Sequence, residues 1–194
     1  REKHIKTFWT FHDCWAFTGH CVYFDYVCCE KWKTGCHDCP QKRTYPESLF
    51  LDGSRKNYER KKAVFSEIPN LTLTVPSHWL EGRVKQSFLR DYPVEVIYNQ
   101  VDKSVFKPTP GDFRLKNGLE GKFVILGVAS VWEERKGLKD FVALSKLLDG
   151  RFQIVLIGLN QKQLDTLPSE ILGLPRTDNV TQLVQAYSEA DVFV

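Results

Sequence analysis

Short apolar runs alternate along this chain with segments of helical period. Apolar runs rich in β-branched residues predict buried strands at residues 5–11, 71–75, 94–98, 122–131, 152–157 and 191–194. Apolar residues spaced three and four apart predict helices over 47–67, after Ser77, over 137–148 and over 181–187. Strand and helix therefore alternate, which is typical of α/β proteins whose parallel sheets are covered by helices.

A proline-containing stretch divides this pattern. Residues 99–111 hold Pro108 and Pro110 and show little periodicity, as a linker does. We expect a partial N-terminal domain over 1–98, a crossover over 99–111 and a partial C-terminal domain over 112–194. A doubly wound sheet usually has about five or six strands, so both domains are expected to be incomplete. The chain has no Met and ends within an apolar run, which favours a fragment.

Residues 14–41 have no clear period and contain all six cysteines of the chain. A loop of this length needs a crosslink of its own, because little else offsets its ordering entropy. Four of the thiols, Cys21, Cys29, Cys36 and Cys39, have spacings that suit a tetrahedral zinc ion. A site with four thiolates has no open position, so the predicted zinc is structural.

Other interpretations of the cysteines stay open. They could be separate buried thiols, or they could form disulfides, although a secreted disulfide-rich domain usually spreads its cysteines along the chain. In the zinc interpretation His20 or His37 could replace a thiolate, and Cys14 and Cys28 are left over.

Composition excludes several classes of protein. The chain has 194 residues, of which 42% are hydrophobic and 26% charged, as in ordinary globular proteins. No apolar run approaches the roughly 18 to 20 residues that span a bilayer. The formal charge of +3 does not argue for a nucleic-acid partner. We expect a cytoplasmic protein.

Parallel sheets bind ligands beyond the carboxyl ends of their strands, so residues that directly follow strands are candidates for chemistry. His12 follows the first predicted strand. A histidine there could orient a hydroxyl group or act as a base near neutral pH. The alternative is a structural histidine that is hydrogen-bonded to the following loop.

A second candidate lies between a buried strand and a helix. Ser130, Arg135, Lys136 and Gly137 occupy this segment. The first turn of a helix offers unpaired N–H groups and a partial positive charge, Lys adds a point charge, and Arg adds a planar fork. We predict that the segment binds a diphosphate, with a solvated pair of cations as the alternative. The chain lacks the dinucleotide and P-loop glycine patterns, which argues against a dehydrogenase or a P-loop kinase.

The stretch 54–62 carries five basic residues. It could dock peripherally on an anionic membrane, at the inner face of the cytoplasmic membrane, at about 1 kcal/mol per cation. A solvated helix face is the simpler interpretation. The basic stretch, the cysteines and the aromatic residues together leave a second interpretation open. In that interpretation the protein is a zinc-stabilised module that binds nucleic acid or an anionic surface.

Several motifs, in this order, resemble those of the family 4 retaining glycosyltransferases of the GT-B fold. The branch most similar to this chain builds bacterial capsule, exopolysaccharide and lipopolysaccharide sugars. The matching stretches are residues 12–19, 34–40, 76–80, 96–102, 105–108 and 125–137.

This resemblance implies two Rossmann-like parallel-sheet domains and transfer of a sugar from a nucleotide-diphosphate donor, of UDP or GDP type, with retained configuration. The C-terminal domain would hold the donor, and the N-terminal domain a glycan or lipid-linked acceptor. Lys136 matches the family's phosphate-binding lysine, and His12 matches a histidine near the transferred sugar. The resemblance also implies that catalysis needs no metal and that the protein has no nucleic-acid partner.

The chain departs from the family at two points. The family commonly has an arginine five or six positions before its phosphate-binding lysine, where this chain has Ser130 or Val131. The acidic motif that grips the donor sugar is expected beyond Val194, so we expect the fragment to be inactive alone.

Overall fold

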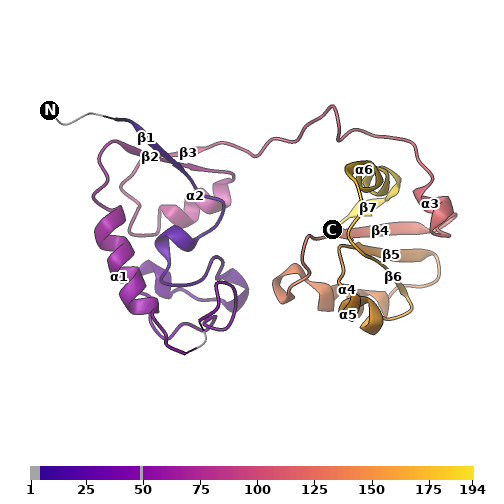
Figure 1. Cartoon of the computed structure of the whole chain (residues 1–194), viewed down its shortest axis with the longest axis horizontal. Coiled ribbons are helices and arrows are strands. Elements are labelled where there is room, and N and C mark those ends of the chain that lie inside the picture. The colour runs from indigo at the N-terminus through magenta and orange to yellow at the C-terminus, as the bar shows by residue number, and fades with distance from the viewer. Residues whose placement is uncertain (1–4, 49) are drawn as a thin grey trace. The chain divides into compact units, whose positions relative to one another are not determined.

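The computed structural model describes residues 5–48 and 50–194. The chain forms two compact units, residues 1–100 and 101–194 (Figure 1). Every strand pair among the described residues is parallel. The predicted α/β class with two parallel sheets is therefore confirmed.

The first unit has a sheet in the order β1-β2-β3. These strands are Thr7–Thr10, Leu71–Val75 and Val94–Val96, and the unit's helices are α1, Ser54–Phe65, and α2, His78–Val84. Helix α2 begins where the sequence predicts, because the Ser77 hydroxyl accepts a hydrogen bond from the Leu80 N–H at 3.2 Å.

The prediction of a helix from residue 47 is wrong at its start, since α1 begins only at Ser54. The Asp52 carboxylate explains the later start. It accepts the Ser54 N–H at 2.9 Å and, with its other oxygen, the Cys39 N–H at 2.8 Å. Burial acts to raise the pKa of Asp52, but these hydrogen bonds outweigh it and lower that pKa below its ordinary value. The residues before α1 are thus tied to the cysteine-containing segment.

One hydrophobic cluster forms the core of the first unit. The irregular segment contributes Phe17, Phe24 and Trp32 to it, alongside residues of β2 and α2. The Trp32 side chain is 1% exposed and stacks on Phe24 at 4.5 Å between ring centroids. In Figure 1 the helices and the irregular segment lie on one side of the sheet. On β1, Phe8 is 62% exposed.

The second unit has a sheet in the order β6-β5-β4-β7. Its strands β4 to β7 are Phe123–Val128, Phe152–Ile157, Ile171–Leu174 and Val192–Phe193. Its helices α3 to α6 are Phe113–Lys116, Leu138–Ser145, Gln161–Thr166 and Val180–Glu189.

Three of these elements, α3, α5 and β6, lie outside the predicted set. They are too short to show a period. Helix α5 is stabilised instead by a capping box, in which Asn160 and Gln163 bond each other's backbone N–H groups.

Successive side chains of β4 and β5 point to opposite faces of the sheet and so form two hydrophobic clusters in the second unit. Ile125, Ile154 and Leu156 pack in the cluster that includes Phe141 of α4. Val124, Leu126, Val155 and Ile157 pack in the cluster that includes Ala186 of α6. Figure 1 shows α4 and α5 on one side of this sheet and α6 on the other.

Candidate functional site

The ends of β4 and β5 meet closely at the carboxyl edge of the second sheet. The Ala129 N–H donates to the Ile157 carbonyl at 3.1 Å. Gly158 follows with φ of 97°, and a Cβ atom there would lie 1.8 Å from the Ala129 oxygen. Only glycine fits both this conformation and this approach, so the loop after β4 lies against the end of β5.

Trp132 anchors that loop. Its side chain is 6% exposed, and its Nε1–H donates to the Ile157 carbonyl at 3.0 Å. The Gln163 amide of α5 donates to the Trp132 carbonyl at 2.8 Å. Trp132 lies outside the residues predicted for this site, although a lone large aromatic residue before Glu133 and Glu134 was the available signal.

Beyond this anchor, residues 134–136 form a 3-10 turn, and α4 begins at Leu138. Gly137 is the N-cap residue of α4, with φ of 74°, and no side chain caps the start of this helix by a hydrogen bond. The first N–H groups of the helix therefore keep their capacity to bind an acceptor. The four predicted phosphate-binding residues follow one another along this single loop.

The charged side chains of this loop differ in whether they form ion pairs within the protein. The Arg135 Nε–H donates to Glu133 at 2.9 Å, and Lys139 pairs with Glu134 at 2.7 Å. The hydrogen bond from Lys139 lowers the pKa of Glu134. Lys136 is exposed, and no residue in the described part of the chain pairs with its ammonium group. Asp140, in the first turn of α4, is the acidic residue there.

His12 lies in the first unit, two residues after β1. The loop holds its backbone, since the Tyr23 hydroxyl donates to the His12 carbonyl at 3.1 Å. The neighbouring Asp13 carboxylate accepts the Trp15 N–H at 2.8 Å. The His12 ring is exposed, and no described side chain hydrogen-bonds to it. The ring is therefore sterically available to a ligand.

The structure brings the four predicted zinc ligands together. Cys21, Cys29, Cys36 and Cys39 line one space of about 10 Å³. A hydrogen bond between Cys21 and Cys39 is the main cause that raises the pKa of Cys21 and lowers that of Cys39 to about 7. The Gly19 N–H donates to Cys36 Sγ at 3.2 Å, while burial raises the pKa of Cys36 to about 11.

The structure does not support the predicted zinc, however. Within residues 5–48 and 50–194, no group of three or more His, Cys, Asp or Glu side chains could hold a metal ion. Cys21 and Cys39 are hydrogen-bonded to each other instead, and Cys36 Sγ accepts the Gly19 N–H. His37 is exposed and bonded to Asp38 at 3.0 Å.

Lys61 is a buried cation, although the sequence predicts that it lies on a solvated helix face. It is 8% exposed, and its ammonium donates to the carbonyls of Trp15 at 2.6 Å and Thr18 at 3.0 Å. It also lies 3.4 Å from the centroid of a Trp15 ring. Burial lowers its pKa to about 8. The missed signal was its helical spacing from Tyr58 and Phe65.

Comparison with known proteins tests the expected fold and resemblance. No family model matches the chain. Over 64 residues it is 40% identical to a putative colanic acid biosynthesis glycosyl transferase, WcaC, of Escherichia coli (strain K12), covering 33% of this chain and 15% of that protein. A sucrose-phosphate synthase from Thermosynechococcus elongatus has a similar structure, with a TM-score of 0.53 at 17% identity, over 70% of this chain and 37% of that one. The likeness to this synthase shows that the chain shares the GT-B fold of two parallel-sheet units.

These matches confirm the expected family resemblance and fold, and they do not favour the zinc-stabilised binding module. The chain spans about 15% of the length of the curated relative that it matches, so the activity of the whole protein belongs to a proposal. Among its described helices, none is long and apolar enough to cross a membrane.

Proposed function

We propose that the protein transfers a sugar from a nucleotide-diphosphate donor of UDP or GDP type to a glycan or lipid-linked acceptor, with retained configuration, in cell-surface polysaccharide biosynthesis. The second unit binds the donor and the first unit binds the acceptor. The exposed cations of α1 provide peripheral contact with an anionic membrane. The observation that carries the proposal is the loop after β4, which presents the unpaired Lys136 next to an uncapped helix start.

In this proposal a diphosphate accepts hydrogen bonds from the first N–H groups of α4 and from the Ser130 hydroxyl. Lys136 neutralises its charge, and Arg135 exchanges Glu133 for a phosphate oxygen. Asp140 opposes the ligand electrostatically. We therefore expect Lys136 to contribute most to diphosphate binding, because its ammonium group need not give up a protein partner first.

The same cation favours the reaction. As the bond between sugar and diphosphate breaks, negative charge grows on the departing phosphate, and a cation already in place stabilises it. His12 orients a hydroxyl group of the transferred sugar, since its ring bonds to no described side chain. Retention of configuration follows from the family resemblance.

Thermal unfolding of the 194-residue chain with UDP, GDP and ADP tests donor binding. UDP or GDP should raise the melting temperature, and Lys136→Ala should remove most of that rise. Lys146→Ala is the matched control, because Lys146 is an exposed lysine at the other end of α4. If no nucleotide stabilises the chain, or if both variants respond alike, the proposal fails.

Transfer is tested in the whole protein that contains this chain. His12→Ala should slow transfer by about 10²-fold and leave nucleotide binding unchanged. An unchanged transfer rate would remove His12 from the reaction.

A further inference from the structure

A cavity of about 630 Å³ lies within the first unit, beside the irregular segment. Its volume falls in the range of about 300 to 1,000 Å³ that is usual for small-molecule sites. Its lining residues with polar or aromatic side chains include Trp15, His20, Glu47, Asn57, Arg60 and Lys61.

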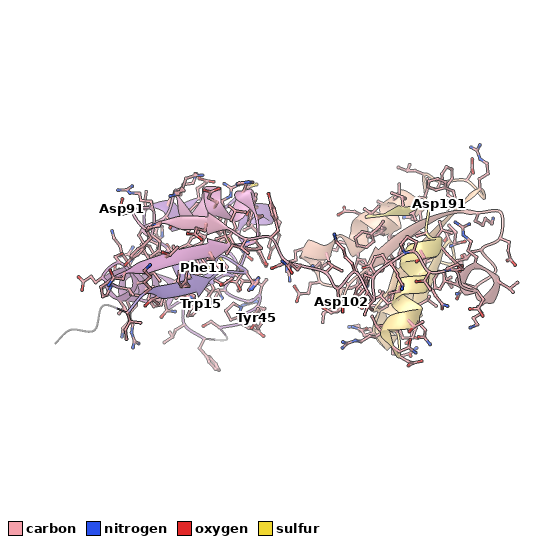
Figure 2. The ribbon with its side chains drawn as sticks, turned by 90° about the horizontal axis from the view of Figure 1, so that it is seen from above. Phe11, Trp15, Tyr45, Asp91, Asp102 and Asp191 are labelled. Atoms are coloured by element: carbon pink, nitrogen blue, oxygen red, sulfur yellow. The ribbon has the colours of Figure 1, made fainter. Side chains whose placement is uncertain are left out.

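Trp15 provides a flat apolar surface in the cavity. Its side chain is 43% exposed, which is unusual for the largest aromatic residue in a packed loop. Lys61 holds it in place, with its ammonium on the Trp15 carbonyl and 3.4 Å from a ring centroid. Figure 2 labels Trp15 and also Phe11, the buried residue that follows β1. The ring is therefore a held platform on which a ligand can stack.

One polar atom at the cavity lacks a partner. His20 Nε2 is buried, and no described group lies within hydrogen-bonding distance of it. A buried polar atom without a partner is costly, typically by about 1–3 kcal/mol. The atom has almost no accessible surface, so a ligand hydroxyl group bonds to it only if the His20 ring turns toward the cavity.

The remaining polar groups are of mixed character. Glu47 can only accept hydrogen bonds, Arg60 can only donate them, and the Asn57 amide does both. All three are exposed, and in the described part of the chain no hydrogen bond or ion pair engages their side chains. An anionic ligand would meet the Glu47 carboxylate, so the set suits a neutral ligand with many hydroxyl groups better than a phosphate.

We propose that this cavity binds a neutral pyranose, the terminal sugar of the acceptor glycan. A pyranose has apolar faces of C–H groups that can stack on Trp15. Its neighbouring hydroxyl groups both donate and accept, as Glu47, Asn57 and Arg60 require. The role of acceptor rests on the proposed function, whereas sugar binding itself does not.

Saturation-transfer NMR on the 194-residue chain tests this proposal. The probes are methyl α-glycosides of glucose, galactose and mannose, with glucuronic acid and inorganic phosphate as anionic comparisons. At least one neutral glycoside should bind with a dissociation constant of about 1 mM. Trp15→Ala should weaken binding about tenfold, a loss of about 1.4 kcal/mol. Arg60→Ala and Asn57→Ala, at exposed positions, should weaken it without affecting folding.

Arg55→Ala is the matched control, because Arg55 is exposed on the same helix and does not line the cavity. Binding only of glucuronic acid or phosphate, no saturable binding, or binding insensitive to Trp15, Asn57 and Arg60 would each overturn the proposal. Nucleotide binding without sugar binding would defeat this inference alone. Sugar binding by a chain that no nucleotide stabilises would defeat the proposed function and leave a sugar site without an acceptor role.

Discussion

The two units of this chain build their cores differently. In the second unit the alternation of β4 and β5 divides the apolar residues between two clusters, each backed by helices. In the first unit one cluster takes many of its largest members from an irregular segment, among them Phe17, Phe24 and Trp32. The first core therefore depends on a few large side chains in a loop, and the second depends on the regular period of its strands.

The largest expected effect comes from emptying the loop core. Trp32→Ala should lower the free energy of unfolding of the first unit by about 3–5 kcal/mol, because it leaves a cavity among stacked rings. Trp132→Ala is the counterpart in the second unit. Hydrogen exchange followed by mass spectrometry should show each loss confined to its own unit, and a loss shared by both would contradict their independence.

Gly158 tests the close packing of the second unit's edge. Gly158→Ala places a Cβ against the Ala129 carbonyl at a φ of 97°, so strain of about 1–3 kcal/mol is added to a steric clash. Gly118→Ala is the control, since its φ of 64° is also positive but nothing lies within 4 Å of the new atom. Urea unfolding should show a clearly greater loss at Gly158, and equal losses would mean that the clash is relieved without cost.

The same contrast explains what could be predicted from the sequence. In the second unit, apolar runs indicate the strands β4 and β5, and helical spacing indicates α4. All three elements were therefore expected within a few residues of their observed bounds. Helix α5 and strand β6 are too short to show a hydrophobic period. Helix α5 is stabilised by its capping box instead. The late start of α1 depends on Asp52, which bonds Cys39 across 13 residues, and no local pattern reveals such a contact.

The candidate sites divide along the same line. The candidate phosphate-binding residues could be predicted because they lie within one short segment, from Ser130 to Gly137. The anchoring of that loop by Trp132 through Ile157 and Gln163 depends on distant partners and was missed. The spacing of the cysteines correctly indicated that they gather, but not that they would bond to one another and to the backbone.

Lys61 gives the first unit a pH dependence of its own. Burial lowers its pKa from 10.5 to about 8, so between these values the unfolded chain holds a proton that the folded chain has lost. Stability contributed by this group therefore rises with pH across that window, by at most about 1.4 kcal/mol per pH unit, and is lost as pH falls through 8.

Urea unfolding of the chain and of Lys61→Met, from about pH 7 to about pH 10.5, isolates this effect. The stability of the unsubstituted chain relative to the variant should be constant below about pH 8 and should rise above it. Lys62→Met, at an exposed neighbouring position, should show no such trend. A flat difference for Lys61→Met would show that its ammonium is not desolvated.

The smallest effect concerns thiol reactivity within the first unit. The hydrogen bond from Cys21 lowers the pKa of Cys39 to about 7, whereas burial, with Asp25 and Asp13, raises that of Cys14 to about 12. Iodoacetamide at pH 8 should therefore label Cys39 well before Cys14 in the folded chain. Mass spectrometry of tryptic peptides gives the order, and earlier labelling of Cys14 would contradict the packing around it.

The placement of the donor diphosphate is tested most directly by amide NMR shifts of the 194-residue chain during titration with UDP and GDP. The account predicts that the signals of residues 130–137 and Gly158 move with one saturation curve, and that Lys136→Ala abolishes this movement. Shifts confined to residues 5–48 and 50–100, or unaffected by Lys136→Ala, would contradict it.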